Sequence, residues 1–108
     1  MKRLNLLLII VSVVILGCAS HDYRVKNGKL YLRLNKPDAI AVYFASSLDE
    51  FRLHKAERLK SNTWQIVVPA GAELRYFYMI DGHLYVPPCR FKEMDDFGTE
   101  NCIYVPGM

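Results

Sequence analysis

The chain has 108 residues, of which 52% are hydrophobic, and its fourteen basic and eleven acidic residues give a formal charge of +3. Residues 1–17 contain two of the basic residues and no acidic one, so the rest of the chain, with twelve basic and eleven acidic residues, has a charge of +1. This near-neutral balance excludes nucleic-acid binding through a basic face, and the length is that of one small domain.

An export signal is predicted at residues 1–17. Two basic residues precede an apolar run from Leu6 to Leu16. This run is shorter than the roughly 20 apolar residues of a membrane-spanning helix, which favours a cleaved signal peptide. Residues 15–18, Ile-Leu-Gly-Cys, resemble the bacterial lipobox, in which a peptidase cuts before a cysteine that then carries acyl chains. The resemblance implies lipid attachment at Cys18 and a place on the outer membrane, facing the periplasm; an ordinary signal peptide cut near Ala19 is the alternative.

The next elements are predicted to be strands joined by tight turns. Asn27-Gly28 favours a hairpin, because both residues tolerate the positive φ of a two-residue turn. Residues 30–34 alternate leucine with Tyr31 and Arg33, which is typical of a half-buried strand. We therefore expect residues 18–28 to form the lipidated tether and first strand, and residues 29–106 to form the domain.

The middle of the chain shows further strand patterns. A turn at residues 37–38 precedes a short apolar strand at 40–44, and a strand at 63–68 places Trp64, Ile66 and Val68 on one side. Residues 48–60 favour a loop plus a short strand over a helix, and the basic run within them is typical of a solvated strand edge.

Residues 75–86 give the strongest hairpin signal, because extended runs flank Asp81-Gly82. Alternation puts Tyr76, Tyr78 and Ile80 on one side of the first run, and Phe77 and Met79 on the other. Pro87-Pro88 excludes continuation as a central strand, a loop is expected from Cys89 to Phe97 with further loop signal at 95–98, and a last strand follows at 102–105. Six to eight short strands without a convincing helix predict an all-β, antiparallel sandwich.

Cys89 and Cys102 are expected to form a disulfide, since an exported chain folds in an oxidising compartment. The loop that they close is worth about 3 kcal/mol by the chain-entropy estimate.

Several motifs in fixed order resemble the family 48 carbohydrate-binding modules, which include the isoamylase N-terminal domain and the glycogen-binding domain of the AMP-activated protein kinase β subunit. The resemblance implies an early-set, immunoglobulin-like sandwich. The motifs are LYLRL at 30–34, PDA at 37–39, VYF at 42–44, SLDEF at 47–51, Trp64, PAG at 69–71, YFYMIDG at 76–82 and FGTEN at 97–101.

The same resemblance implies non-catalytic binding of an α-glucan or related saccharide. Phe51 falls where the family stacks a tryptophan on a glucose ring, and Tyr85 lies next to a second platform position. That position is Leu84 here, and Phe77 replaces a lysine that bonds sugar hydroxyls. The residues expected to contact sugar are Phe51, Tyr85, Phe97, Thr99 and Asn101.

An apolar face centred on Phe77, Met79 and Leu84 suggests an alternative, in which the domain is an adaptor that docks another envelope protein. A third possibility is that the loop after residue 88 simply covers Phe77 and Met79. These alternatives stay open at the level of sequence.

No enzyme, metal site or cofactor is expected. His21, His54 and His83 lack metal-ligand spacing and are expected to be solvated surface histidines. Asp95 and Asp96 are adjacent, so their side chains point apart, which is typical of loop chemistry. The expected partners are therefore the membrane, through Cys18, and a glucan or an envelope protein.

Overall fold

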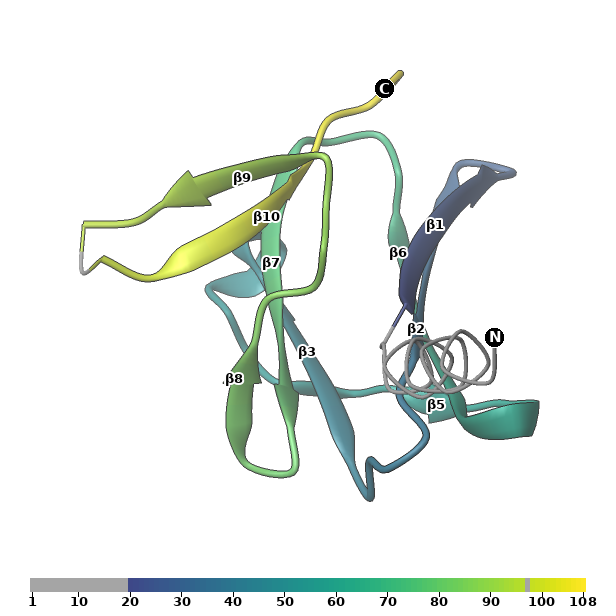
Figure 1. The fold of residues 1–108 in the computed structure, drawn as a ribbon. Coiled ribbons are helices and arrows are strands. Elements are labelled where there is room, and N and C mark those ends of the chain that lie inside the picture. Colours follow the sequence, from purple (N-terminus) through teal and green to yellow (C-terminus); the bar gives the residue numbers. More distant parts are fainter. Residues whose placement is uncertain (1–19, 97) are drawn as a thin grey trace, which may run out of the picture.

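The computed structural model describes residues 20–96 and 98–108, which form two antiparallel β-sheets facing one another (Figure 1). The four-stranded sheet has the order β1-β2-β6-β5, with β1 Ser20–Lys26, β2 Lys29–Asn35, β6 Thr63–Pro69 and β5 Glu57–Arg58. The six-stranded sheet has the order β4-β3-β7-β10-β9, with β4 His54–Lys55, β3 Val42–Ser46, β7 Leu74–Ile80, β10 Glu100–Tyr104 and β9 Phe91–Met94. In this sheet β8 (His83–Tyr85) also pairs with β7.

The predicted all-β antiparallel sandwich is confirmed, while its immunoglobulin-like, early-set topology stays a prediction. Two short 3-10 helices, η1 (Ser47–Asp49) and η2 (Lys60–Asn62), are the helical elements in residues 20–96 and 98–108. The described chain has ten strands rather than six to eight. The additional strands are β9 and the pair of two-residue strands in the segment between residues 53 and 59.

Both predicted two-residue hairpins are present. Asn27 and Gly28 have φ values of 53° and 74°, and Asp81 and Gly82 have φ values of 50° and 81°. Positive φ at both central residues is the mark of a type I′ turn, whose twist matches that of the strands it joins. The Asp81 carboxylate also accepts hydrogen bonds from the backbone N–H of Ala41 at 2.8 Å and of Ile40 at 2.9 Å, which ties this turn to the start of β3.

Buried side chains alternate with more exposed ones along β2 and along β7, and the buried ones form much of the core between the sheets. Leu30, Leu32 and Leu34 are fully or almost fully buried, and they face the buried side chains of β7. The prediction that Tyr76, Tyr78 and Ile80 point inward is confirmed. The larger buried side chains of the core are Leu30, Leu32, Leu34, Val42, Phe44, Trp64, Leu74, Tyr76, Tyr78, Ile80 and Tyr104.

The segment between residues 52 and 60, predicted to be a strand edge, contributes one short edge strand to each sheet. β4 lies at one edge of the six-stranded sheet and β5 at one edge of the four-stranded sheet. Buried Ala56 joins them, and its backbone N–H donates to the Val42 carbonyl at 2.8 Å. Ala56 is therefore the point where the chain crosses from one sheet to the other, which explains why no single long element forms here.

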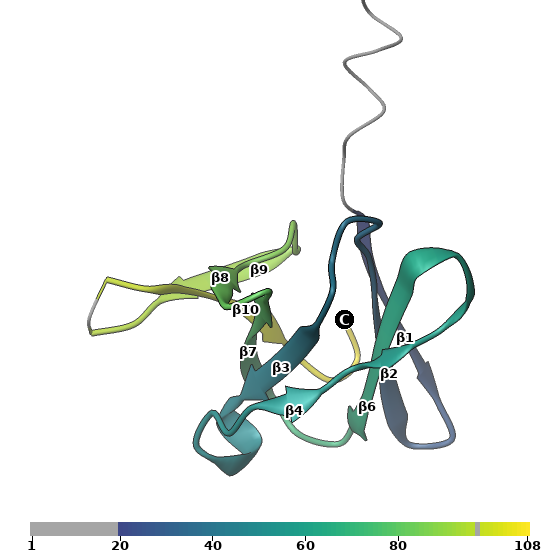
Figure 2. The same cartoon turned by 90° about the horizontal axis from the view of Figure 1, so that it is seen from below.

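The expectation of a loop from Cys89 to Phe97 is wrong over Phe91–Met94, where β9 pairs with β10. The two strands form a ribbon that extends away from the rest of the domain (Figure 2). All four residues of β9 are exposed, so this strand has no buried face to produce an alternating pattern. The predicted disulfide is present, and Cys89 and Cys102 lie with their Cα atoms 6.0 Å apart.

Candidate functional site

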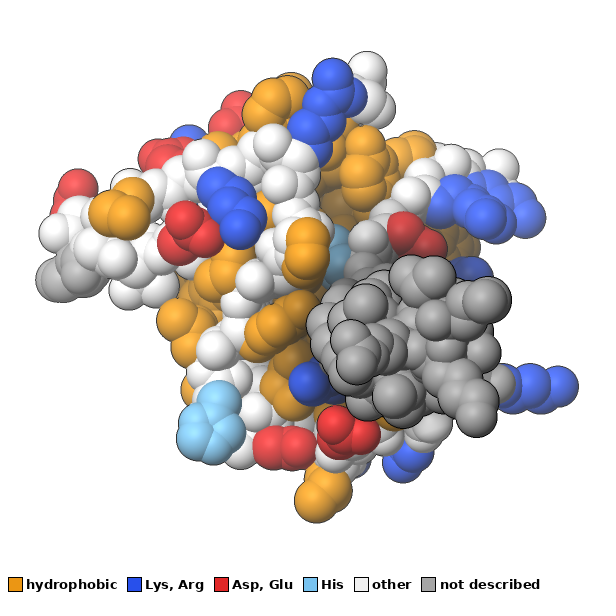
Figure 3. All heavy atoms as spheres, in the orientation of Figure 1, with side chains coloured by type: hydrophobic (Ala, Val, Ile, Leu, Met, Phe, Trp, Pro, Cys, Tyr) orange, Lys and Arg blue, Asp and Glu red, His pale blue; other side chains and the backbone are white. Residues whose placement is uncertain are grey.

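The side of the six-stranded sheet that points away from the core carries an apolar strip. Tyr43 pairs with Met79, Met79 pairs with Leu84, and Ala45 pairs with Phe77. Because residues opposite one another in a sheet point to the same side, these side chains share one surface. We call this surface, formed by Tyr43, Phe51, Phe77, Met79 and Leu84, the outer face. Hydrophobic side chains are visible at the molecular surface around β7 and β8 (Figure 3).

Phe51 joins this surface from the turn after η1. The side-chain oxygen of Ser46 accepts from the Leu48 N–H and caps η1, and the chain then reverses through Glu50 and Phe51, which have positive φ values of 60° and 62°. The Phe51 N–H donates to the Ser46 carbonyl at 2.8 Å, which holds the reversal. As a result the Phe51 ring lies parallel to the Phe77 ring, with centroids 5.8 Å apart and an interplanar angle of 12°.

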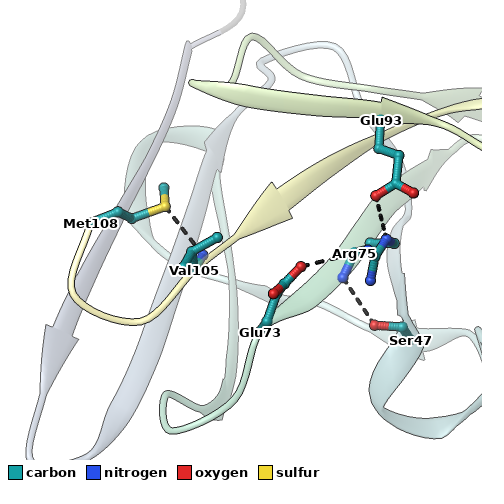
Figure 4. Close-up of polar contacts among 6 residues, drawn as sticks. All are labelled: Ser47, Glu73, Arg75, Glu93, Val105 and Met108. Atoms are coloured by element: carbon teal, nitrogen blue, oxygen red, sulfur yellow. Dashed lines mark hydrogen bonds and ion pairs between the residues drawn. The ribbon is translucent and has the colours of Figure 1, made fainter.

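A network of polar groups surrounds Arg75 (Figure 4). Arg75, two residues before Phe77 and on the same side of β7, donates from Nε to Glu93 Oε2 at 2.6 Å and has Glu73 Oε1 3.5 Å from its Nη2. The hydrogen bond and charge of Glu93 raise the pKa of Arg75 above its usual value. The Arg75 backbone N–H also donates to Ser47 Oγ at 2.9 Å, which fastens η1, and with it Phe51, against β7.

Among the predicted sugar-contacting residues that the structure describes, Tyr85 is separated from Phe51. Tyr85 pairs with Tyr78 and packs against the core, on the opposite side of the sheet from Phe51. Asn101 lies opposite Glu93, on the same side of the sheet as Arg75, but it is only 4% exposed. Thr99 lies in the turn between β9 and β10, where its backbone N–H donates to Asp95 Oδ1 at 2.8 Å. Phe97 lies outside the described residues.

The alternative contact set is assembled instead. Phe77, Met79 and Leu84 share the outer face, and Phe51 joins them by stacking on Phe77. Leu84 is 50% exposed and Phe51 is 38% exposed, while Phe77 and Met79 are partly buried. The sequence assigns Phe51 to the sugar-contacting set and Phe77 to the alternative set, and the structure joins the two residues in one stacked pair.

A second feature is a cavity of about 280 Å³ between the two sheets, at the side where β1 faces β10 and the segment before β9. Three tyrosines and His21 contribute rings, and Asp22 and Arg90 contribute charges. The lining residues are His21, Asp22, Tyr23, Leu32, Tyr76, Pro88, Cys89, Arg90, Ile103, Tyr104 and Met108.

His21 is not the solvated histidine that the sequence predicts. Its Nε2 is 3.0 Å from the Tyr78 hydroxyl, and its ring packs edge to face against Tyr78 and tilted against Tyr76. Burial lowers the pKa of His21 from 6.5 to about 4, although the charge of Asp22 and a hydrogen bond to the Pro88 backbone act in the opposite direction. His21 is therefore neutral near pH 7 and links β1 to the opposite sheet.

The other two histidines are exposed, as predicted. His54 contacts the Asp49 carboxylate, and this contact lowers the pKa of Asp49. His83 follows the Asp81-Gly82 turn. In residues 20–96 and 98–108, no group of three His, Cys, Asp or Glu side chains is arranged to hold a metal ion.

Comparisons with known proteins do not assign the chain. No family model matches it, and no curated protein matches its sequence. Among the described residues, no helix is long and apolar enough to cross a membrane. The predicted signal peptide at residues 1–17 and the predicted lipid attachment at Cys18 both lie outside the described residues.

Proposed function

We propose that this protein is a non-catalytic lipoprotein, held in the cell envelope by acyl chains on Cys18, whose outer face binds an α-glucan or a related saccharide. The observation that carries the proposal is the parallel Phe51–Phe77 pair with the Arg75–Glu93 ion pair beside it. The resemblance of the sequence motifs to family 48 carbohydrate-binding modules supports the same ligand class.

The chemistry of the outer face suits a sugar ring. A pyranose presents a C–H face that packs on an aromatic ring, and hydroxyls that need hydrogen-bond partners, because an unpaired buried polar group costs about 1–3 kcal/mol. Arg75 has five N–H donors in total, and Glu93 offers carboxylate oxygens. On the other side of the strip, Lys55 pairs with Tyr43 and adds a further donor. The rings therefore have polar groups on two borders.

Docking of another envelope protein is the second candidate. It is favoured by Leu84, which is 50% exposed and lies directly opposite Met79 in the β7–β8 pair. Methionine and exposed apolar patches are common where proteins contact one another. Both functions use the outer face, but they predict that different residues contribute most to binding. Sugar binding depends on Phe51 and Arg75, and protein docking depends on Met79 and Leu84.

Electrophoresis of the full chain in non-ionic detergent, through native gels cast with glycogen, amylose or peptidoglycan glycan strands, tests the proposal. We expect retardation in at least one gel and its loss in Phe51→Ala and Phe77→Ala. Val67→Ala is the matched control, because Val67 is an exposed apolar residue of the other sheet, 41% exposed.

Two results would contradict the proposal. One is migration of the wild type at the rate of an inert control in every gel. The other is retardation that Phe51→Ala does not change. If the gels show no binding and photocrosslinking from position 84 captures one envelope protein in the wild type but not in Met79→Asp, the docking function replaces the glycan function.

A further inference from the structure

β1 has one edge without a partner in the described part of the chain. It lies at the end of the four-stranded sheet and pairs only with β2. Every residue of β1 except His21 is exposed. A seven-residue edge of this kind offers unpaired backbone groups to another strand.

The hairpin register determines which backbone groups face the free edge. Lys26 and Lys29 are opposite one another and flank the two-residue turn. In such a hairpin the flanking residues exchange hydrogen bonds, and alternate residues then point their N–H and C=O groups away from the partner strand. In β1 the outward-pointing groups belong to His21, Tyr23 and Val25.

The same three residues send their side chains toward the inside of the sandwich, because they lie opposite Leu34, Leu32 and Leu30. Tyr23 is nevertheless 36% exposed and Val25 is 50% exposed. The Tyr23 ring packs edge to face against the Tyr104 ring, with centroids 6.0 Å apart. The free edge therefore combines unpaired backbone with apolar surface that an added strand would cover.

We propose that the partner of this edge is β1 of a second copy of the chain, paired antiparallel about a two-fold axis at Tyr23. In this register Tyr23 lies opposite Tyr23 of the second copy, and His21 lies opposite Val25. All three are residues whose backbone groups face the edge, so each opposing pair exchanges two hydrogen bonds. The two four-stranded sheets become one continuous sheet across the axis.

The charges of β1 complement themselves in this register. Asp22 lies opposite Arg24 of the second copy, and Arg24 lies opposite Asp22, so two attractive cross-strand pairs form. In the neighbouring symmetric registers like charges meet: centring on Asp22 opposes two carboxylates, and centring on Arg24 opposes two guanidinium groups, although it also places Asp22 opposite Lys26. Of the three registers, the one centred on Tyr23 has two attractive pairs and no like-charge pair. The order of charges in β1 therefore selects the Tyr23 register over a slip in either direction.

Exchanging the charged residues of β1 tests this dimer. The measurement is the molar mass of the full chain in detergent, determined by light scattering over a series of protein concentrations. Arg24→Asp and Asp22→Arg each replace two attractions by two repulsions, and we expect each to raise the dimer dissociation constant about tenfold or more. The double variant Asp22→Arg/Arg24→Asp restores opposite charges across the axis, and we expect it to dimerise again.

Val25→Pro provides a second test that does not depend on charge. This substitution removes an N–H group that faces the free edge, so we expect the dimer to be lost. The hydrogen bonds between β1 and β2 do not use this N–H group, so we expect the monomer to keep its fold. Val25→Ala controls for the side chain, and circular dichroism checks the fold of each variant. The outer face is remote from these substitutions, so retardation in glycan gels stays at the wild-type level.

Three results would overturn the proposal. The first is a wild type that is monomeric at every concentration. The second is a dimer that survives both single exchanges and Val25→Pro. The third is a double exchange that stays monomeric while it unfolds at the same temperature as the wild type.

Discussion

Acid should weaken the fold through His21, and the size of the effect follows from the position of this residue. The pKa of His21 is about 4 in the folded protein and 6.5 when unperturbed. At 1.36 kcal/mol per pKa unit, this difference is worth about 3 kcal/mol of stability. Because the folded pKa is the lower one, the unfolded chain takes up a proton first as the pH falls. The contribution is therefore complete above pH 6.5 and is lost as the pH falls toward about 4.

The assay is urea unfolding followed by the fluorescence of Trp64, which is the one tryptophan of the chain and is 3% exposed. Between about pH 7 and pH 5 the wild type should lose roughly 2 kcal/mol more stability than His21→Gln, which keeps a hydrogen-bonding side chain but does not titrate in this range. His83→Gln is the matched control, since His83 is exposed, and it should follow the wild type.

Two results would refute this reasoning. One is an identical pH dependence in the wild type and His21→Gln. The other is an NMR titration in which the His21 ring takes up its proton near the unperturbed 6.5.

Two further predictions concern the disulfide and the hydrogen bonds of the Asp81 carboxylate. Replacing Cys89 and Cys102 by alanine should lower the free energy of unfolding by about 3 kcal/mol, because the bond closes a loop with a sequence separation of 13; a loss under about 1 kcal/mol in urea unfolding would contradict the estimate. Asp81→Ala should cost about 1–2 kcal/mol, since the N–H groups of Ile40 and Ala41 lose their acceptor and alanine disfavours the positive φ. Asp81→Asn, which keeps an acceptor and tolerates this φ, should lose less in the same thermal or urea experiment, and equal losses in the two variants would argue against it.

Local chemistry made much of the fold predictable. Asn27-Gly28 and Asp81-Gly82 form turns because of the conformations these residues allow, which requires no knowledge of the rest of the chain. The alternation in β2 and β7 marks a strand with one buried face, and both strands have that face. The inward position of Tyr76 and Tyr78 follows from the same pattern.

Features that depend on distant partners were missed. β9 has no buried face, and its pairing with β10 shows no local signal. The partner of His21 is 57 residues away in the sequence, so nothing near His21 distinguishes it from a surface histidine. Tyr85 was grouped with Phe51 by position in a motif, whereas its pairing with Tyr78 turns it to the inner side of the sheet.

The position of β1 also decides how the domain responds to a pull on its N-terminal side. Ser20 is paired with Asn35, and the turn at Asn27 and Gly28 lies at the far end of the hairpin. A force applied at Ser20 perpendicular to the strands, while the rest of the domain is held, would open the β1–β2 hydrogen bonds one after another, beginning with those nearest Ser20, instead of shearing them all at once. Sequential opening needs little force, so β1 would peel away first, and the contact between His21 and Tyr78 would be the first side-chain link between the sheets to resist it.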